Sequence, residues 1–428
     1  MAGGAGAQTR LTYEAALEYV SSLRRFGVKL GLDRMHAFLD QLGHPERGKR
    51  GALIAGTNGK GSTSAFLESI LRARGLHTGL TPSPHLSSYT ERVQLDAEPI
   101  SEDAFAAAVT DLRELVAPVV ERMGQSTEFE FLIAMAIWWL APRTDRLVIE
   151  IGMGGRLDST NALDLGVAVI TNVTYDHRRH LGRTVRKIAG EKAGIIKAGN
   201  VVITAATGAA LSVIEHAAVE ARAADLWRLG KEIHLRARWR GWDGSELDVS
   251  GPGFSYSDLR IGLAGMFQPA NAALAVAAAH ALGDATPEAV RQGLAATTWR
   301  GRIERVEDRL VLDCAHNQDG MRQLVRSLRR LLGAAPVTVV FAAMADKEVD
   351  RVLSELRKLN PAHVVFTLPA SASRALAPDT LAEMWGTPGR HVRPASRALA
   401  RARELAGADG WVVVCGSLFL VGELLSSR

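Results

Sequence analysis

Cysteine is scarce in this sequence, and long apolar runs are missing. Only Cys314 and Cys415 occur among 428 residues, each inside a short β-branched run. Both are predicted to be buried free thiols, with a disulfide between them or a catalytic thiol as the alternative. The most apolar stretch, residues 131–141, falls short of the roughly 20 residues that cross a bilayer, and it predicts a buried helix.

The excess of positive over negative charge is also small. The net charge is +5 and the pI is near 9.3, which suits anionic small molecules and does not require nucleic acid. The first residues, MAGGAGAQTR, contain no apolar segment followed by a cleavage site, so the chain is expected to stay in the cytoplasm. Hydrophobic residues make up 47% of the chain and charged residues 23%, as in folded globular proteins. The length of 428 residues predicts two or three domains.

Short β-branched runs alternate with amphipathic stretches, which predicts parallel sheets covered by helices. A helix is predicted over residues 64–74, and the domain boundary is predicted within residues 297–302. The predicted strands are residues 52–55, 147–151, 167–171, 201–204, 310–314, 337–341, 363–366 and 411–415.

Residues 230–263 have a different texture, in which Trp, Arg and Gly follow an alternating hydrophobic pattern. This pattern predicts β-hairpins. Basic residues interleaved with aromatic ones can stack nucleic-acid bases. A solvated hairpin face explains the same residues more simply, and it is the interpretation adopted.

The strongest single motif is GTNGKGS at residues 56–62, which follows a predicted strand and precedes a predicted helix. Glycines let the backbone wrap around an anion so that several N–H groups face a phosphate. Lys60 supplies a point charge for the β- and γ-phosphates, and Ser62 offers its hydroxyl to Mg²⁺. Gly61 separates these two residues, which departs from the usual P-loop pattern. A turn that binds nothing is the alternative.

This loop resembles the ATP loop of the Mur ligase superfamily and, within it, of the folylpolyglutamate synthase and dihydrofolate synthase enzymes. The resemblance continues in the expected order over most of the chain. The matching motifs are KLGLDRM (29–35), SPHLSSYTERV (83–93), TEFE (127–130), IEIGMGGRLDSTN (149–161), DHRRHLGRTVRKIAGEKAGIIK (176–197), GMFQPANAALA (265–275), GRIE (301–304), DCAHN (313–317) and GSLFLVGE (416–423).

The resemblance implies an α/β fold with a P-loop-containing, Mur-ligase-like central domain at residues 1–297 and a Rossmann-like α/β domain at residues 298–428. The implied activity is ATP-dependent amide ligation, in which L-glutamate is added to dihydropteroate, to reduced folates or to both through an acyl phosphate. The expected protein is a monomer whose partners are these small molecules, with no nucleic acid and no membrane.

A metal site is implied around Glu150, which lies in the apolar run LVIEIGMGG, where an unpaired carboxylate would be costly. A salt bridge to an arginine is the alternative for this residue. The resemblance makes Glu150 a Mg²⁺ ligand together with Ser62, Ser83 and His177, for about two ions. It also implies a carbamylated lysine at Lys192, which from the residues alone could be a surface lysine.

The resemblance places Asn271 near the adenine base, Arg302 at a phosphate and Asp313 at the ribose. ATP would then lie between two domains, whose closure excludes water. The expected nucleotide site is Gly56, Thr57, Asn58, Gly59, Lys60, Gly61, Ser62, Asn271, Arg302 and Asp313, and the expected catalytic residues are Lys60, Lys192 and His316.

His316 and Asn317 have an equally good alternative role, which is to order the turn after the strand. Near them the chain departs from the family pattern at Gln318, Asp319 and Gly320, and it departs again at Arg300.

The pterin substrate is expected along TEFE, where Phe129 could stack a flat ring, and along a second segment. TEFE could instead be only the N-cap and first turn of a helix. The substrate residues implied by the resemblance are Thr127, Glu128, Phe129, Glu130, Leu157, Asp158 and Ser159.

Three other functions were weighed. One is a specialist for a single reaction of this family, and another is a Mur-type ligase for a peptidoglycan precursor. The latter is disfavoured because the phosphate loop begins within the first sixty residues and leaves too little chain for the usual N-terminal domain. A non-enzymatic nucleotide-binding switch would not need Glu150, His177 and Lys192.

Overall fold

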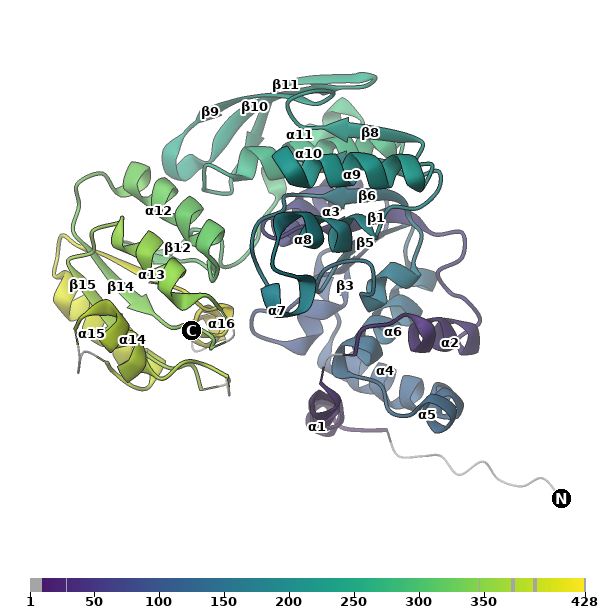
Figure 1. The fold of residues 1–428 in the computed structure, drawn as a ribbon, viewed down its shortest axis with the longest axis horizontal. Coiled ribbons are helices and arrows are strands. Elements are labelled where there is room, and N and C mark those ends of the chain that lie inside the picture. Colours follow the sequence, from purple (N-terminus) through teal and green to yellow (C-terminus); the bar gives the residue numbers. More distant parts are fainter. Residues whose placement is uncertain (1–9, 28, 346, 371–373, 388–390, 427–428) are drawn as a thin grey trace.

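The structure is a computed structural model that describes residues 10–27, 29–345, 347–370, 374–387 and 391–426. It contains three sheets, with helices packed against them (Figure 1). No helix in this described part of the chain is long and apolar enough to span a bilayer.

The largest sheet has eight strands in the order β4-β3-β2-β5-β1-β6-β7-β8. Its central strands are parallel and nearly free of polar residues, because helices cover both faces of the sheet. The strands are β1 (Arg50–Ala55), β2 (Thr78–Thr81), β3 (Gln94–Leu95), β4 (Glu98–Pro99), β5 (Arg146–Glu150), β6 (Gly166–Ile170), β7 (Val201–Thr204) and β8 (Asp225–Arg228).

One face of this sheet packs against α3 (Lys60–Ala73), α10 (Gln268–Ala281) and α11 (Pro287–Ala296). The other face forms the larger core. Its helices are α1 (Tyr13–Ser22), α2 (Asp33–Gln41), α4 (Glu102–Leu115), α5 (Ala117–Met123), α6 (Glu128–Leu140), α8 (Val185–Ala193) and α9 (Gly208–Glu220), and a short α7 (Arg178–Leu181) precedes α8.

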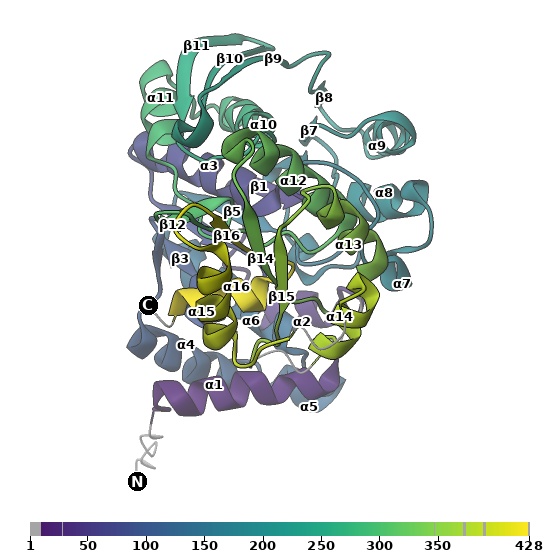
Figure 2. The ribbon, with the colours of Figure 1, turned by 90° about the vertical axis from the view of Figure 1, so that its left-hand side faces the viewer.

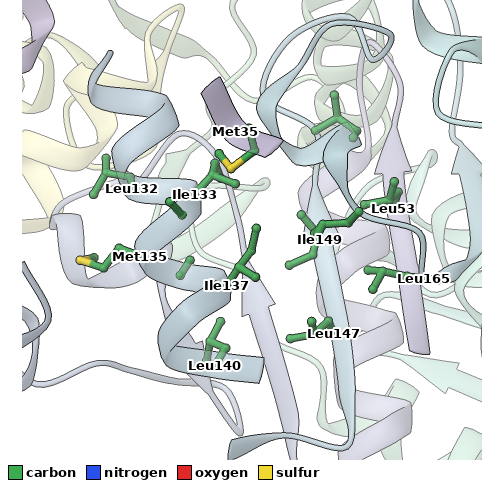
Figure 3. Packing of buried hydrophobic residues seen from close by; sticks show 14 of the residues in the cluster. Met35, Leu53, Leu132, Ile133, Met135, Ile137, Leu140, Leu147, Ile149 and Leu165 are labelled. Atoms are coloured by element: carbon green, nitrogen blue, oxygen red, sulfur yellow. The ribbon is translucent and has the colours of Figure 1, made fainter. Parts of the chain in front are cut away.

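Helix α6 shows how this core is built. It is apolar on nearly every side because it lies between the sheet and other helices. Figure 3 shows Ile137 and Leu140 of α6 facing Leu147 and Ile149 of β5. Each such side chain contributes roughly 1.5–3 kcal/mol by its burial. The core therefore fixes the carboxyl end of β5, where Glu150 stands.

Gly293 of α11 sets how closely α11 approaches α3. A Cβ added there would lie 2.5 Å from the Cα of Ile70, and the Ser69 hydroxyl donates to the Gly293 carbonyl at 2.7 Å. Both neighbours are backbone or tightly held, so neither can move aside.

We therefore expect Gly293→Ala to lower the free energy of unfolding by about 1–3 kcal/mol through overpacking, as measured by denaturant titration. The matched control is Gly190→Ala in α8, where the added Cβ meets nothing within 4 Å. That change should be neutral or slightly stabilising. Equal effects of the two substitutions would contradict the packing argument.

A three-stranded antiparallel sheet packs over α10 and α11 and reaches toward the C-terminal part of the chain (Figure 1). Its strands are β9 (His234–Trp239), β10 (Ser245–Gly251) and β11 (Phe254–Ile261), with a short 3-10 helix, η5 (Gly241–Asp243), between the first two.

The C-terminal part has a five-stranded sheet in the order β12-β13-β16-β14-β15, parallel except for the first strand, with helices on both faces (Figure 2). Its strands are β12 (Glu304–Glu307), β13 (Leu310–Leu312), β14 (Val337–Phe341), β15 (His363–Phe366) and β16 (Trp411–Cys415). Its helices are α12 (Gln318–Leu332), α13 (Val349–Arg357), α14 (Pro378–Trp385), α15 (Ala395–Ala406) and α16 (Leu418–Ser426).

Three aromatic contacts join the small antiparallel sheet and η5 to the C-terminal part. In one of them the guanidinium of Arg305 lies 5.4 Å from the centroid of the Trp242 ring. The rings of Trp242 and Trp411 stack with centroids 5.3 Å apart and 12° between their planes. The guanidinium of Arg330 lies 5.8 Å from the ring of Trp239. The basic and aromatic residues of 230–263 thus have a structural role. Strand β9 is mostly exposed, Trp239 at its end contacts Arg330 of α12, and Trp242 of η5 stacks on Trp411 of β16.

The α/β class, the eight predicted strands, the hairpins and the buried helix at residues 131–141 are confirmed, with shifts of a few residues at element ends. Cys314 and Cys415 are buried free thiols, as predicted. The predicted boundary falls between α11 and β12, and the two-domain division stays a prediction.

Candidate active site

The phosphate loop connects β1 to α3 and needs glycine at two positions. Gly56 has φ 149° and Gly59 has φ 87°. A Cβ at Gly59 would lie 2.4 Å from Oδ1 of Asn271, and one at Gly56 would lie 1.8 Å from Oγ1 of Thr171. The Thr171 hydroxyl donates to the Asn58 carbonyl at 2.6 Å. The loop is therefore held in a tight conformation, with the N-terminus of α3 behind it.

Glu150, at the carboxyl end of β5, faces this loop. Its Oε1 lies 3.7 Å from Nζ of Lys60, and its Oε2 accepts the backbone N–H of Ser83 at 3.3 Å. Burial raises the pKa of Glu150, and the charge of Lys60 opposes this shift. The hydroxyl oxygen of Ser83 is buried without a hydrogen-bond partner among the described residues. The site thus presents a carboxylate that Lys60 only partly neutralises, and beside it a hydroxyl with no partner among the described residues.

Lys192 of α8 lies beneath the phosphate loop. It is 4% exposed, and its Nζ donates to the Gly56 carbonyl at 2.7 Å. Burial lowers the pKa of Lys192 to about 7, and the positive charge of Lys60 adds to this effect. The amine is therefore substantially neutral near pH 7, and a surface role for this lysine is excluded.

His177 is the N-cap residue before α7 and has φ 47°, an uncommon conformation for a residue other than glycine. It stands beside Asp176, which receives a hydrogen bond from Nζ of Lys347 at 2.7 Å. Burial alone would raise the pKa of Asp176, but the charge of Lys347 holds that pKa far below its ordinary value. The ion pair joins the C-terminal part of the chain to the loop that carries His177.

A seam of amides and carboxylates crosses between the phosphate loop and the first turn of α12. The side-chain amides of Asn58 and Asn317 hydrogen-bond to each other at 2.9 and 3.3 Å. Asn58 also donates to Oδ2 of Asp319 at 3.1 Å, and Asn317 donates to Asp176 at 3.0 Å. Asn317 caps α12 through the N–H of Gly320. Two residues of the divergent segment after Asn317 therefore have defined roles.

The proposed nucleotide residues come from both parts of the chain. Asn271 donates to Gln268 at 3.0 Å, and Gln268 donates to the Ser62 hydroxyl at 3.3 Å. Asp313 accepts the N–H groups of Ile303 and Ala315 at 2.9 and 2.8 Å. Arg302 donates to the carbonyl of the residue before it at 3.0 Å and has no carboxylate partner within the described chain.

His316 is held by its Nδ1, which donates to the Cys314 carbonyl at 2.9 Å. Burial lowers the pKa of His316 to about 4, and the charge of Lys347 contributes. The ring is therefore neutral near pH 7, and Nε2 is left as a hydrogen-bond acceptor. This contact also orders the turn after β13, so the two roles weighed for His316 are compatible.

A single cavity of about 1330 Å³ brings these groups together. It is lined by the phosphate loop, the carboxyl end of β5, the segment after β2 and the C-terminal part of the chain. The lining includes Asn58, Gly59, Lys60, Ser62, Ser83, Glu150, His177, Asn271, Arg302, Asp313 and His316. The phosphate loop and the turn after β13 therefore face the same space.

The TEFE segment divides into two roles. Thr127 and Glu130 form a capping box at the start of α6, and Arg34 pairs with Glu130 at 2.8 Å. Glu128 and Phe129 line the cavity. The Phe129 ring covers Gly152, where a Cβ would lie 2.5 Å from it. The alternative of an N-cap thus accounts for two of the four residues.

The second segment expected to bind substrate, residues 157–159, lies close to Phe129, because both Phe129 and Asp158 adjoin Gly152. The buried Asp158 accepts the backbone N–H of Met153 at 2.8 Å and that of Thr160 at 3.1 Å. Ser159 is also buried, whereas Leu157 is 39% exposed. Their assignment to the pterin stays a prediction.

One group of cavity residues was not singled out from the sequence. Arg24 of the 3-10 helix η1 (Leu23–Phe26) pairs with Glu128 at 3.1 Å, and Tyr89 contacts both side chains. Arg92 donates through Nε to Nδ1 of His85 at 2.9 Å. Burial lowers the pKa of His85 to about 3, and the charge of Arg92 adds to this effect. Three of these residues lie in the SPHLSSYTERV motif, and that motif was the available signal.

The oxygens of Glu150 and Ser83 could bind a metal ion that takes its remaining ligands from water and substrate. No three His, Cys, Asp or Glu side chains of the described residues converge in the way that a complete metal site would require. Glu150 and the unpartnered Ser83 hydroxyl supply oxygens at the cavity wall. Mg²⁺ commonly binds one or two protein oxygens together with waters and substrate phosphates, and this site matches that pattern.

The sequence matches two family profiles. The profile described as "Mur ligase middle domain" covers residues 54–279, and "Mur ligase, glutamate ligase domain" covers residues 301–418.

Comparison with individual proteins and with solved structures points to the same family. The dihydrofolate synthase/folylpolyglutamate synthase of Bacillus subtilis is 34% identical over 96% of this chain and 98% of its own length. A folylpolyglutamate synthase structure from Mycobacterium tuberculosis, complexed with ADP and AMPPCP, aligns with a TM-score of 0.91 at 33% identity over 97% of this chain and 98% of that chain. An E. coli structure in complex with DHPP and ADP aligns at 0.88 and 29% identity over the same shares. This chain belongs to the Mur ligases and, within them, to the dihydrofolate synthase/folylpolyglutamate synthase family.

Proposed function

We propose that the protein joins L-glutamate to dihydropteroate and to reduced folates, at the expense of ATP and through an acyl phosphate. The observation that carries this proposal is the cavity in which a phosphate loop, Glu150 and two residues of the C-terminal part, Arg302 and Asp313, face one another. A carboxylate cannot expel oxide, so it must be activated before an amine attacks. Phosphorylation supplies that activation.

In the first step a carboxylate oxygen of the acceptor attacks the γ-phosphorus of ATP, and ADP leaves. Negative charge accumulates on the phosphoryl oxygens, so nearby cations and N–H donors lower the barrier. Lys60 and the N-terminus of α3 provide them from one side, and Arg302 provides a forked, permanent cation from the other. Asn271 would contact the base and Asp313 the ribose.

In the second step the glutamate amine attacks the acyl carbon and inorganic phosphate leaves. His316 lines the cavity with Nε2 as an acceptor, and it would hold the ammonium group of glutamate before that group loses its proton. The polar seam around Asn58 and Asn317 closes one side of the site. Closure excludes water that would hydrolyse the acyl phosphate.

Glu150, Ser83, Ser62, His177 and Lys192 would hold about two Mg²⁺ ions, which would neutralise phosphate charge when bound. Lys192 would do so as a carbamate, because CO₂ reacts with a neutral amine and the product is anionic. The low pKa of Lys192 and its burial beside the loop support this assignment. A cytosolic monomer is part of the proposal.

The deciding measurement is mass spectrometry of products after the purified protein is incubated with ATP, Mg²⁺ and glutamate, with dihydropteroate or tetrahydrofolate as acceptor. We expect both acceptors to gain the mass of one glutamyl residue, and tetrahydrofolate to gain further residues with time. Product from one acceptor alone would mark a specialist. The absence of an adduct with either would overturn the proposal.

A further inference from the structure

Arg92 occupies a distinct position in the cavity wall. It ends the 3-10 helix η2 (Tyr89–Arg92), in the segment that follows β2. The charges of Glu128, at the TEFE end of the cavity, and of Glu150, at the phosphate-loop end, both act on it. Arg92 lines the same cavity as Glu128, in the region expected to hold the pterin, and Glu150, in the region where the acyl phosphate would form.

Within the described chain, this arginine forms no direct salt bridge, although the charges of Glu128 and Glu150 act on it. Two other cavity cations are paired, Arg24 with Glu128 and Lys60 with Glu150, whereas Arg302, which is expected at a phosphate, has no such partner among the described residues. In the part of the chain that the structure describes, no carboxylate lies within salt-bridge distance of Arg92, and its two Nη groups donate no hydrogen bond. Its Nε is used by His85, and its guanidinium carbon lies 5.9 Å from the Tyr89 ring centroid. A half-buried, unpaired guanidinium indicates an anionic ligand.

His85 adds a second donor beside Arg92. Because its Nδ1 accepts from Arg92, the ring proton must be on Nε2. The ring packs against Tyr89, with centroids 4.4 Å apart, and it lines the same cavity. The pair thus offers the forked Nη groups and a neutral N–H, with their orientation fixed by the hydrogen bond between them.

The two acceptors of the proposed reaction differ in the anion that they bring to this place. Dihydropteroate has one carboxylate, and that carboxylate reacts. A folate ends in a glutamyl residue with two carboxylates, of which one reacts and the other stays a few bonds away. We infer that Arg92 and His85 bind this second, non-reacting carboxylate and so act as the specificity site for folate acceptors.

This inference rests on the proposed function and goes further, because it separates the two activities within one cavity. The phosphate groups already have Lys60, Arg302 and the loop N–H groups. A role for Arg92 at phosphate would affect both acceptors equally. A role at the second carboxylate affects only the acceptor that has one.

The test is Arg92→Gln, which removes the charge and keeps most of the side-chain volume. We expect the KM for tetrahydrofolate to rise about 10- to 100-fold, since hydrogen bonds to charged groups are among the stronger ones in proteins. The ratio of kcat/KM for tetrahydrofolate to that for dihydropteroate should fall at least about tenfold. The control is Arg122→Gln, an exposed arginine of α5 outside the cavity, which should leave this ratio unchanged.

A second measurement identifies the ligand group. An acceptor analogue in which 4-aminobutyrate replaces the terminal glutamyl residue lacks the α-carboxylate. Wild-type protein should bind it more weakly than the parent folate, whereas Arg92→Gln should bind the two alike, as in a double-mutant cycle.

Three outcomes would overturn the inference: equal losses for both acceptors, an unchanged ratio, or wild-type protein that uses dihydropteroate alone. None of these would refute glutamate ligation itself. The absence of any product in the wild type would refute the proposed function instead.

Discussion

Replacing Lys192 by alanine is expected to lower the rate of ligation by at least about 10³-fold while the protein stays folded. The amine is buried against the phosphate loop, and burial lowers its pKa to about 7, so it is available for carbamylation. Its loss would remove both a metal-binding oxygen pair and a group beneath the loop. Loss of a preorganised charge-stabilising group commonly costs 10²–10³-fold on its own.

The matched control is Lys187→Ala, an exposed lysine on the same helix, which should retain full activity. Incubation of the wild type with ¹³C-labelled bicarbonate should give one carbamate resonance that Lys192→Ala lacks. ATP binding should change little in the variant, as measured by calorimetry. Full activity of folded Lys192→Ala protein would contradict the assignment, and a purely structural lysine would instead lower the unfolding temperature without changing activity per folded molecule.

Replacing Glu150 by glutamine should change activity and stability in opposite directions. The variant loses the negative charge of the carboxylate, which faces Lys60 and accepts the backbone N–H of Ser83. We expect kcat to fall about 10²–10³-fold and the Mg²⁺ concentration for half-maximal rate to rise at least about tenfold. Because burial raises the pKa of Glu150, its charged form costs folding free energy at neutral pH. The neutral amide should therefore leave the unfolding temperature equal or higher.

Kinetics at varied Mg²⁺ and thermal unfolding monitored by circular dichroism would check both halves of this prediction. Glu114→Gln, at an exposed position of α4, is the control and should alter neither quantity. If Glu150 were only the partner of Lys60 in a structural ion pair, its removal would lower stability and leave the Mg²⁺ dependence unchanged.

Much of the fold could be predicted because each signal is local. The parallel strands are continuous apolar runs that helices cover on both sides, as in β1 and β14. The phosphate loop is a short contiguous motif, and its glycines are required by positive φ at Gly56 and Gly59. The resemblance added Glu150 and Lys192, whose approach to the loop no residue pattern reveals.

The unpredicted parts of the site depend on contacts between distant segments. The pairing of Asn58 with Asn317 joins residues 259 positions apart, and neither amide differs in sequence from an ordinary turn residue. Arg92 is informative because no described residue forms a salt bridge with it and its Nε donates to His85, properties that only the folded chain defines. The capping box of Thr127 and Glu130 was foreseen as an alternative, but local sequence could not separate these residues from the cavity-lining Glu128 and Phe129.

The stacked tryptophans between the small antiparallel sheet and the C-terminal sheet also have an optical consequence. Two indoles with centroids 5.3 Å apart and nearly parallel planes share their electronic transitions. The exciton signal of such a pair in the ultraviolet circular dichroism depends on the distance and the twist between the rings, so it changes when the rings separate. The contact between Trp242 and Trp411 thus gives the protein an intrinsic reporter. The exciton signal would report, without a label, whether the C-terminal sheet moves away from the phosphate loop during turnover.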